Sequence, residues 1–214
     1  MNAEYQKIGN TVWKFSLLIL LLGAMVGVAR NHLEWEFRYP LMLLTMPLSV
    51  ILHGWITGTL VPARAGTAME VLKENWARYL VVAMAVGIGR ALVAYLFALW
   101  VLPAPAGIIK LILVRVILDV LTVYIVPVVF VHRTHLPAIP AGVTFLFGNF
   151  RRSWDLVGGI VLVNVILYAS VYLPHLTTWD GSFVLSVLLV TAGVTINFLV
   201  FAGAVLRLVA PREP

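Results

Sequence analysis

The chain has 214 residues, of which 62% are hydrophobic and 11% are charged, and it contains no cysteine. A soluble domain carries about 25% charged residues, so this composition excludes a cytosolic enzyme, a disordered chain and a secreted disulfide scaffold. The mean hydropathy of +1.00 agrees. The formal net charge of +6 would suggest a nucleic-acid ligand in a soluble protein. Here the cations cluster at the ends of apolar runs, which indicates membrane topology and no nucleic-acid partner.

A helix that crosses a membrane needs about 20 mostly apolar residues. Six runs qualify, at about residues 12–29, 40–61, 79–102, 107–131, 154–173 and 182–208. Their length and uniform hydropathy favour helices over barrel strands. The first run is longer than the apolar core of a usual signal peptide, so we expect it to remain as a span. The sequence therefore predicts an all-α polytopic membrane bundle of six transmembrane helices, forming a single membrane domain over residues 1–214.

The cations are distributed unevenly between the two ends of the spans. If the N-terminus is cytoplasmic, ten of the 15 lysines and arginines lie on the cytoplasmic side, two lie outside and three lie within spans. Cytoplasmic loops are enriched in Lys and Arg. We therefore expect both termini in the cytoplasm.

Two of the cytoplasmic links carry amphipathic segments, which we expect to be interfacial helices at about residues 65–78 and 141–152. Such helices lie in the plane of the membrane with their cations toward anionic headgroups. The expected contacts with lipid or with a protein partner are Arg64, Lys73, Trp76, Arg78, Arg151, Arg152 and Trp154. The two segments also match each other with an offset of 74 residues, which aligns Asn75 with Asn149. A chance match between two basic amphipathic links is the alternative to an internal repeat.

Both segments contain the pattern Leu-x-x-Asn-aromatic-x-Arg before a span, at residues 72–78 and 146–152. This layout, over about residues 61–173, resembles uncharacterised polytopic membrane proteins of bacteria and archaea. Among these is the membrane domain that accompanies some glycerophosphodiester phosphodiesterases. The resemblance implies a scaffold or accessory part in the plasma membrane of a prokaryote. No phosphodiesterase catalytic domain is found in this sequence, so no catalytic residue is carried over.

Charged and polar residues lie near the middle of several predicted spans. Arg90 and Asp119 are equally far from the centre of the link between the third and fourth spans, so two antiparallel helices would place them at one depth. Arg115 lies one turn before Asp119 on the same helix face. A charge at the bilayer centre costs about 2.5–3.5 kcal/mol on insertion scales, so we expect Arg90 to pair with Asp119 and Arg115 to reach the same carboxylate. The polar residues near the middle of other spans are His53, Asn164 and Asn197.

Three interpretations of this polar layer are open. The groups could satisfy one another and hold the bundle together. Two arginines against one aspartate could instead line a net-positive cavity for an anionic substrate or a lipid headgroup. His53 and Asp119 could also relay protons, because histidine titrates near neutral pH.

Other patterns in the sequence have plainer explanations. The pair His132 and His135 has a spacing that could hold a metal, but prolines follow it and no carboxylate is close in sequence. A haem between helices usually needs two intramembrane histidines, and the predicted spans offer His53 alone. We expect neither a metal nor a cofactor. Gly23-x-x-x-Gly27 favours close helix packing, within the bundle rather than between two copies.

No motif in the sequence defines a reaction. The leading hypothesis is an integral membrane subunit or scaffold, non-enzymatic, which anchors or assembles with a partner in the membrane. The alternative is a small transporter or lipid-handling carrier that uses the midplane Arg/Asp cluster. An intramembrane lipid enzyme ranks third, because the sequence lacks a cluster of acids, histidines or serines at one interface.

The predicted topology is tested by labelling single cysteines in this cysteine-free chain. Cysteines at Glu34 and Thr178, in the predicted outer links, should react with a membrane-impermeant thiol reagent in intact cells. A cysteine at Lys73 should react only after the cells are opened. The reverse labelling pattern would invert the topology.

Overall fold

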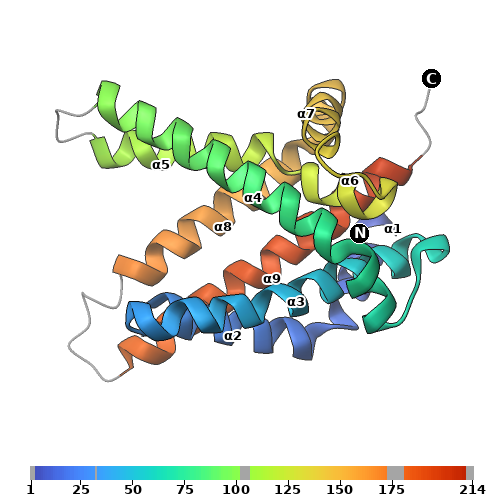
Figure 1. The fold of residues 1–214 in the computed structure, drawn as a ribbon, viewed down its shortest axis with the longest axis horizontal. Helices are drawn as coiled ribbons and strands as arrows, with labels where there is room; N and C mark the ends of the chain where they lie inside the picture. The colour runs from blue at the N-terminus through green and yellow to red at the C-terminus, as the bar shows by residue number, and fades with distance from the viewer. Residues whose placement is uncertain (1–2, 32, 102–106, 173–180, 211–214) are drawn as a thin grey trace.

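The computed structural model describes residues 3–31, 33–101, 107–172 and 181–210, and within these ranges the chain is all-α, with no strand. Figure 1 shows the helices crossing back and forth along one long axis. In chain order they are α1 (Ala3–Trp13), α2 (Ser16–Asn31), α3 (Trp35–Leu60), the 3-10 turn η1 (Pro62–Arg64), α4 (Ala68–Val101), α5 (Gly107–Leu121), α6 (Ile125–His132), α7 (Ala138–Gly148), the 3-10 turn η2 (Phe150–Ser153), α8 (Trp154–Tyr172) and α9 (Ser182–Val209).

Five helices are long and apolar enough to cross a membrane, or six when α1 and α2 count as one bent span. This confirms the helical class and the membrane character expected from the sequence. The predicted ends of two spans, residues 102 and 173, lie outside the described residues.

The first span is shorter than predicted and is preceded by a helix that the apolar pattern does not reveal. α2 begins at Ser16, and α1 meets it at an angle of 69°. α1 buries one face, through Ile8, Thr11 and Val12, and leaves its other residues at the surface. The bend takes this polar helix off the axis of the apolar α2.

The first predicted interfacial helix, residues 65–78, is helical only from Ala68, and its prediction as a separate element is wrong. Residues 68–78 are the first turns of α4, which runs unbroken over 34 residues. Thr67 and Glu70 start it with reciprocal hydrogen bonds: the Thr67 amide donates to Glu70 Oε2 at 2.8 Å, and the Glu70 amide donates to Thr67 Oγ1 at 3.3 Å. No proline or glycine follows before Gly87, so nothing ends the helix at the expected boundary. At 1.5 Å per residue α4 is about 51 Å long, more than the hydrocarbon core of about 30 Å.

The second predicted interfacial helix, residues 141–152, is a separate element, although its bounds differ. α7 begins at Ala138 and ends at Gly148, and η2 connects it to α8. In both aligned segments the asparagine side chain donates to the carbonyl four residues earlier, Asn75 to Val71 and Asn149 to Phe145, at 3.0 Å in each case. The two segments therefore share a local hydrogen bond, but the helix continues beyond Asn75 and ends just before Asn149.

The predicted fourth span, residues 107–131, is interrupted in its middle, whereas its uniform hydropathy predicts one continuous helix. α5 ends at Leu121 and α6 begins at Ile125. Pro127 explains the break, because it has no amide hydrogen and its ring clashes with the carbonyl four residues earlier, that of Val123. Proline is tolerated in the first turn of a helix, so α6 begins just before it.

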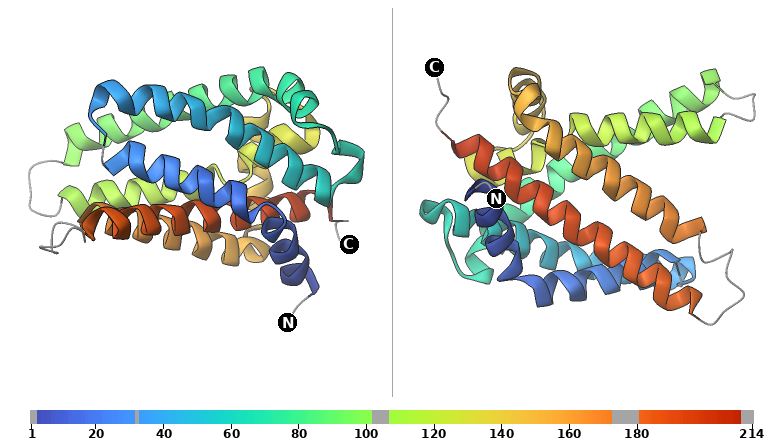
Figure 2. Two further views of the ribbon diagram at one scale, coloured as in Figure 1. Left: turned by 90° about the horizontal axis from the view of Figure 1, so that it is seen from below. Right: turned by 180° about the vertical axis from the view of Figure 1, so that it is seen from behind.

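The tightest helix contact joins α2 to α9 through the two glycines of the first span. A Cβ on Gly23 would lie 2.7 Å from the Cα of Thr191, and one on Gly27 would lie 3.1 Å from the Cα of Val187. The glycines therefore pack within the bundle, as expected. α4 and α5 form a hairpin that extends away from this packed part (Figures 1 and 2). In its outer half the side chains of Ile88, Leu92 and Leu96 are exposed on the surface.

Candidate functional site

The expected ion pair between the third and fourth passes is present. Arg90 of α4 and Asp119 of α5 lie with Nη2 and Oδ1 2.7 Å apart. The same guanidinium nitrogen donates to Thr122 Oγ1. Thr122 in turn donates to the Leu118 carbonyl at 2.8 Å, in the turn where α5 ends. The arginine therefore contacts both a charge and the break between α5 and α6.

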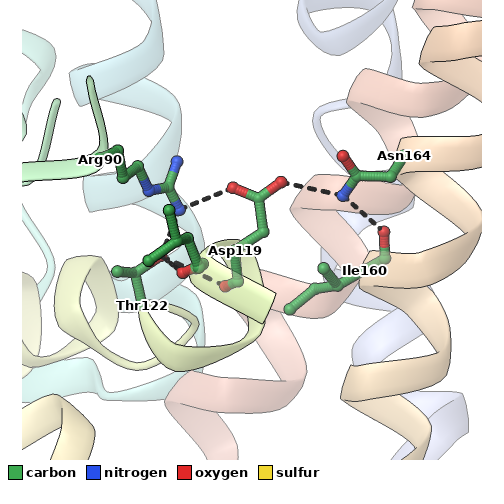
Figure 3. Close-up of polar contacts among 6 residues, drawn as sticks. Arg90, Asp119, Thr122, Ile160 and Asn164 are labelled. Carbon is green, nitrogen blue, oxygen red and sulfur yellow. Dashed lines mark hydrogen bonds and ion pairs between the residues drawn. The ribbon is translucent and has the colours of Figure 1, made fainter. Parts of the chain in front are cut away.

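The second oxygen of the Asp119 carboxylate is also occupied. Asn164 of α8 donates from Nδ2 to Asp119 Oδ2 at 2.9 Å, and to the Ile160 carbonyl at 3.1 Å. Figure 3 shows the carboxylate between Arg90 on one side and Asn164 on the other. One carboxylate thus connects α4, α5 and α8.

A cavity of about 460 Å³ surrounds this cluster. All six residues of the predicted polar layer line it, although they come from five different passes of the chain: His53, Arg90, Arg115, Asp119, Asn164 and Asn197. The remaining walls are largely apolar and include Val82, Val86 and Ile160. The layer inferred from span midpoints is therefore one continuous site.

Arg115 lines the cavity but does not share the carboxylate, so that expectation is wrong. Among the described residues, the side-chain partners of Asp119 are Arg90 and Asn164. The guanidinium of Arg115 lies instead over the ring of Tyr168 in α8, 6.0 Å from the ring centre. The side chain of Arg115 extends to α8 rather than to Asp119, because the face of the Tyr168 ring offers its charge a cation–π contact.

One arginine of the site is not predicted by the sequence. The span boundaries assign Arg30 to the outer link, but it lies in the last turn of α2 and lines the cavity together with Val26, one turn earlier on the same helix face. The four-residue spacing between Val26 and Arg30 could have indicated that both residues face the same way. That prediction also requires that α2 continues to Asn31, which the sequence does not show. The cavity therefore has three arginines and one carboxylate among its described lining residues.

His53 is held at the buried side of the same cavity. Its Nδ1 lies 2.7 Å from the Ser49 carbonyl, which can only accept, so Nδ1 carries a hydrogen. The rings of Phe198 and Phe201 lie with centroids 4.8 and 4.4 Å from the imidazole. The imidazole therefore packs among aromatic rings on the buried side of the cavity.

The predicted interfacial residues of α4 do not form one free surface. Trp76 packs against the main apolar core, and Arg78 lies 3.7 Å from Glu74. Glu74 also pairs with Arg133 at 2.6 Å, so this end of α4 is joined to the residue after α6. The lipid-facing positions expected at Trp76 and Arg78 are therefore occupied by contacts within the protein, while Lys73 stays exposed and Arg64 half-buried.

The second predicted interfacial group is more open. Arg151 and Arg152 are exposed on η2, and Trp154 is exposed at the start of α8, its ring 5.2 Å from that of Phe150. Both arginines line a wide groove of about 1040 Å³ between α7, η2 and the end of α9.

An ion cluster that the sequence does not predict joins the two ends of the chain. Arg207 of α9 lies 2.5 Å from Asp155 and 3.7 Å from Glu4, and the Tyr5 hydroxyl donates to Asp155 at 3.0 Å. Figure 2 shows α1 and the end of α9 at the same end of the bundle.

Comparisons with known proteins give no assignment: no family model, no curated protein and no solved structure matches the chain. Within the described residues, no three histidine, aspartate or glutamate side chains gather as metal ligands would.

The Asp119 contact is tested by a double-mutant comparison in detergent. Asp119→Asn should lower the free energy of unfolding by about 1–3 kcal/mol, because Arg90 keeps its charge and loses its counter-ion. Adding Arg90→Gln should restore part of that loss. Glu36→Gln, which removes an exposed carboxylate elsewhere, should change little. Thermal unfolding followed by circular dichroism measures all four proteins; a double variant less stable than Asp119→Asn alone would contradict the pairing.

Proposed function

We propose that this protein is an integral membrane carrier or binding protein for an anionic ligand, and that the cavity around Asp119 is its site. The observation that carries the proposal is the charge of that cavity. Three arginines and one aspartate line it, and these four groups together give three minus one, or +2. Charges repel one another more strongly where water does not screen them. A bound anionic ligand would therefore stabilise the excess positive charge of the cavity.

The size and walls of the cavity fit a small or amphipathic ligand. Binding cavities for small molecules typically measure about 300–1,000 Å³, and this one measures about 460 Å³. Its polar groups converge from several helices, while Val82, Val86 and Ile160 offer apolar contact. A lipid headgroup with part of its chains, or a small organic anion, meets both requirements.

The sequence alone favours a scaffold, and one observation still supports that second candidate. The α4–α5 hairpin exposes apolar side chains such as Ile88, Leu92 and Leu113. Lipid or a partner helix would cover them equally well. The hairpin gives a scaffold a docking face, but it does not explain why several charges gather in one cavity. We therefore place the carrier first, in the plasma membrane of a prokaryote, with both termini cytoplasmic and anionic headgroups near Arg151 and Arg152.

The proposal is tested by filling the cavity without disturbing the fold. Gly87 of α4 lines the cavity, and a Cβ there would meet nothing within 4 Å. Gly89 lies on the same helix with equal space, but it does not line the cavity. Gly87→Trp should therefore remove ligand binding, and Gly89→Trp should preserve it.

The readout is native mass spectrometry of the protein in an uncharged detergent, with equal phosphatidylglycerol and phosphatidylcholine added. Wild type and Gly89→Trp should retain the anionic lipid over the zwitterionic one, and Gly87→Trp should lose this preference. A soluble-anion arm with inorganic phosphate follows the unfolding temperature of the same three proteins. If wild type prefers no anion in either arm, the proposed function is wrong.

A further inference from the structure

The three arginines of the cavity are not equivalent. Arg90 has an ion-pair partner in Asp119 and a hydrogen bond to Thr122. Within the described residues, no carboxylate lies within ion-pair distance of Arg30 or Arg115. Both arginines are cationic and line the same cavity, so their charges repel each other. One cavity thus holds two charged sites, of which the first has its anion and the second lacks one.

These two arginines come from opposite arms of the fold. Arg30 belongs to the end of α2, in the packed part of the bundle, and Arg115 belongs to α5, in the hairpin (Figure 1). Arg115 lies four residues before Asp119, hence about 6 Å farther toward the outer end of the helix. The ring of Tyr168 covers one side of its guanidinium. Arg30 and Arg115 therefore line the same cavity as the Asp119 cluster without contacting its carboxylate.

Phosphate is the group whose chemistry matches this pair. A guanidinium presents a planar fork of N–H donors that binds phosphate oxygens two at a time, and such charge-assisted bonds are stronger than neutral ones. A phosphomonoester also has three free oxygens and about −1.5 to −2 charge at neutral pH, which can oppose two guanidiniums. A carboxylate has two oxygens and a single charge, so it can satisfy one fork but not both.

We propose that Arg30 and Arg115 form a phosphate clamp, which holds the phosphate of the ligand between α2 and the α4–α5 hairpin. This inference rests on the proposed function and adds the ligand class and the residues that select it. The phosphate can be the monoester headgroup of a lipid such as phosphatidic acid, or inorganic phosphate or a soluble monoester, since the clamp meets the same oxygens in each.

Two pairs of probes separate these sources. Phosphatidic acid in mixed micelles is compared with diacylglycerol, which has the same chains without the phosphate. Inorganic phosphate is compared with chloride at equal ionic strength. Wild type should show a saturable rise in unfolding temperature with at least one phosphate probe and none with its partner. A rise with phosphatidic acid alone identifies a lipid ligand, and a rise with inorganic phosphate identifies a soluble one.

Substitutions then assign the binding to the clamp. The Arg30→Gln, Arg115→Gln double variant should bind the phosphate probe at least about tenfold more weakly, the equivalent of losing one charge-assisted contact. The Lys7→Gln, Lys14→Gln double variant removes two charges from exposed positions outside the cavity and should bind as wild type does. Arg115→Lys keeps the charge without the fork and should fall between. The ligand-free double variant should be at least as stable as wild type, because it loses a repulsion.

Unchanged phosphate binding by the double variant would overturn the clamp. Equal affinity for dodecanoate, a carboxylate amphiphile, would overturn the ligand class. The two proposals fail in different ways. If Gly87→Trp abolishes phosphate binding while the double variant keeps it, the cavity remains the site and the clamp is wrong. If wild type binds no anion at all, the proposed function fails and the clamp fails with it.

Discussion

A charge placed in hydrocarbon must find a counter-ion, and in this protein the carboxylate of Asp119 meets that requirement for the α4–α5 hairpin. Its two oxygens contact Arg90 and Asn164, so the hairpin is fixed to α8 by polar contacts near the middle of the span. The outer half of the hairpin carries exposed apolar side chains. Lipid can surround these side chains in any position of the hairpin, so they do not fix where it lies. The single carboxylate therefore gives the hairpin a defined position, and leaves the rest of the cavity with excess positive charge.

The two parts of the molecule are held by different interactions. α2 and α9 pack at backbone distance, because Gly23 and Gly27 leave no side chain between them. Dispersion contacts of this kind are close and rigid. The first half of α4 also packs into the main apolar core, whereas the outer part of the hairpin is joined to α8 by a few directional bonds around Asp119. A ligand that binds between these parts contacts a rigid wall on one side and a weakly packed arm on the other. Such a division suits a carrier, in which one arm moves against a fixed bundle.

Much of this arrangement is predictable from the sequence, because burying charge and spanning a bilayer constrain depth strongly. Counting along the spans places Arg90 and Asp119 together, and the polar layer proves to be a cavity lining. The remainder depends on local detail. The side chain of Arg115 turns to Tyr168 rather than to the carboxylate one turn away. Arg30 belongs to the helix because α2 extends to Asn31, and no glycine or proline ends the helix that contains Trp76.

The position of the hairpin depends on the direct contact between Asp119 and Arg90. Solid-state NMR of the protein in lipid bilayers, with ¹³C-labelled aspartate and ¹⁵N-labelled arginine, measures that contact through the dipolar coupling of carboxyl carbon to guanidinium nitrogen. Asp155, 2.5 Å from Arg207, provides an internal reference pair, and an Asp119→Asn sample assigns the second signal. We predict a coupling at Asp119 as strong as at the reference. An Asp119 carboxyl carbon with no coupling to arginine would contradict this contact.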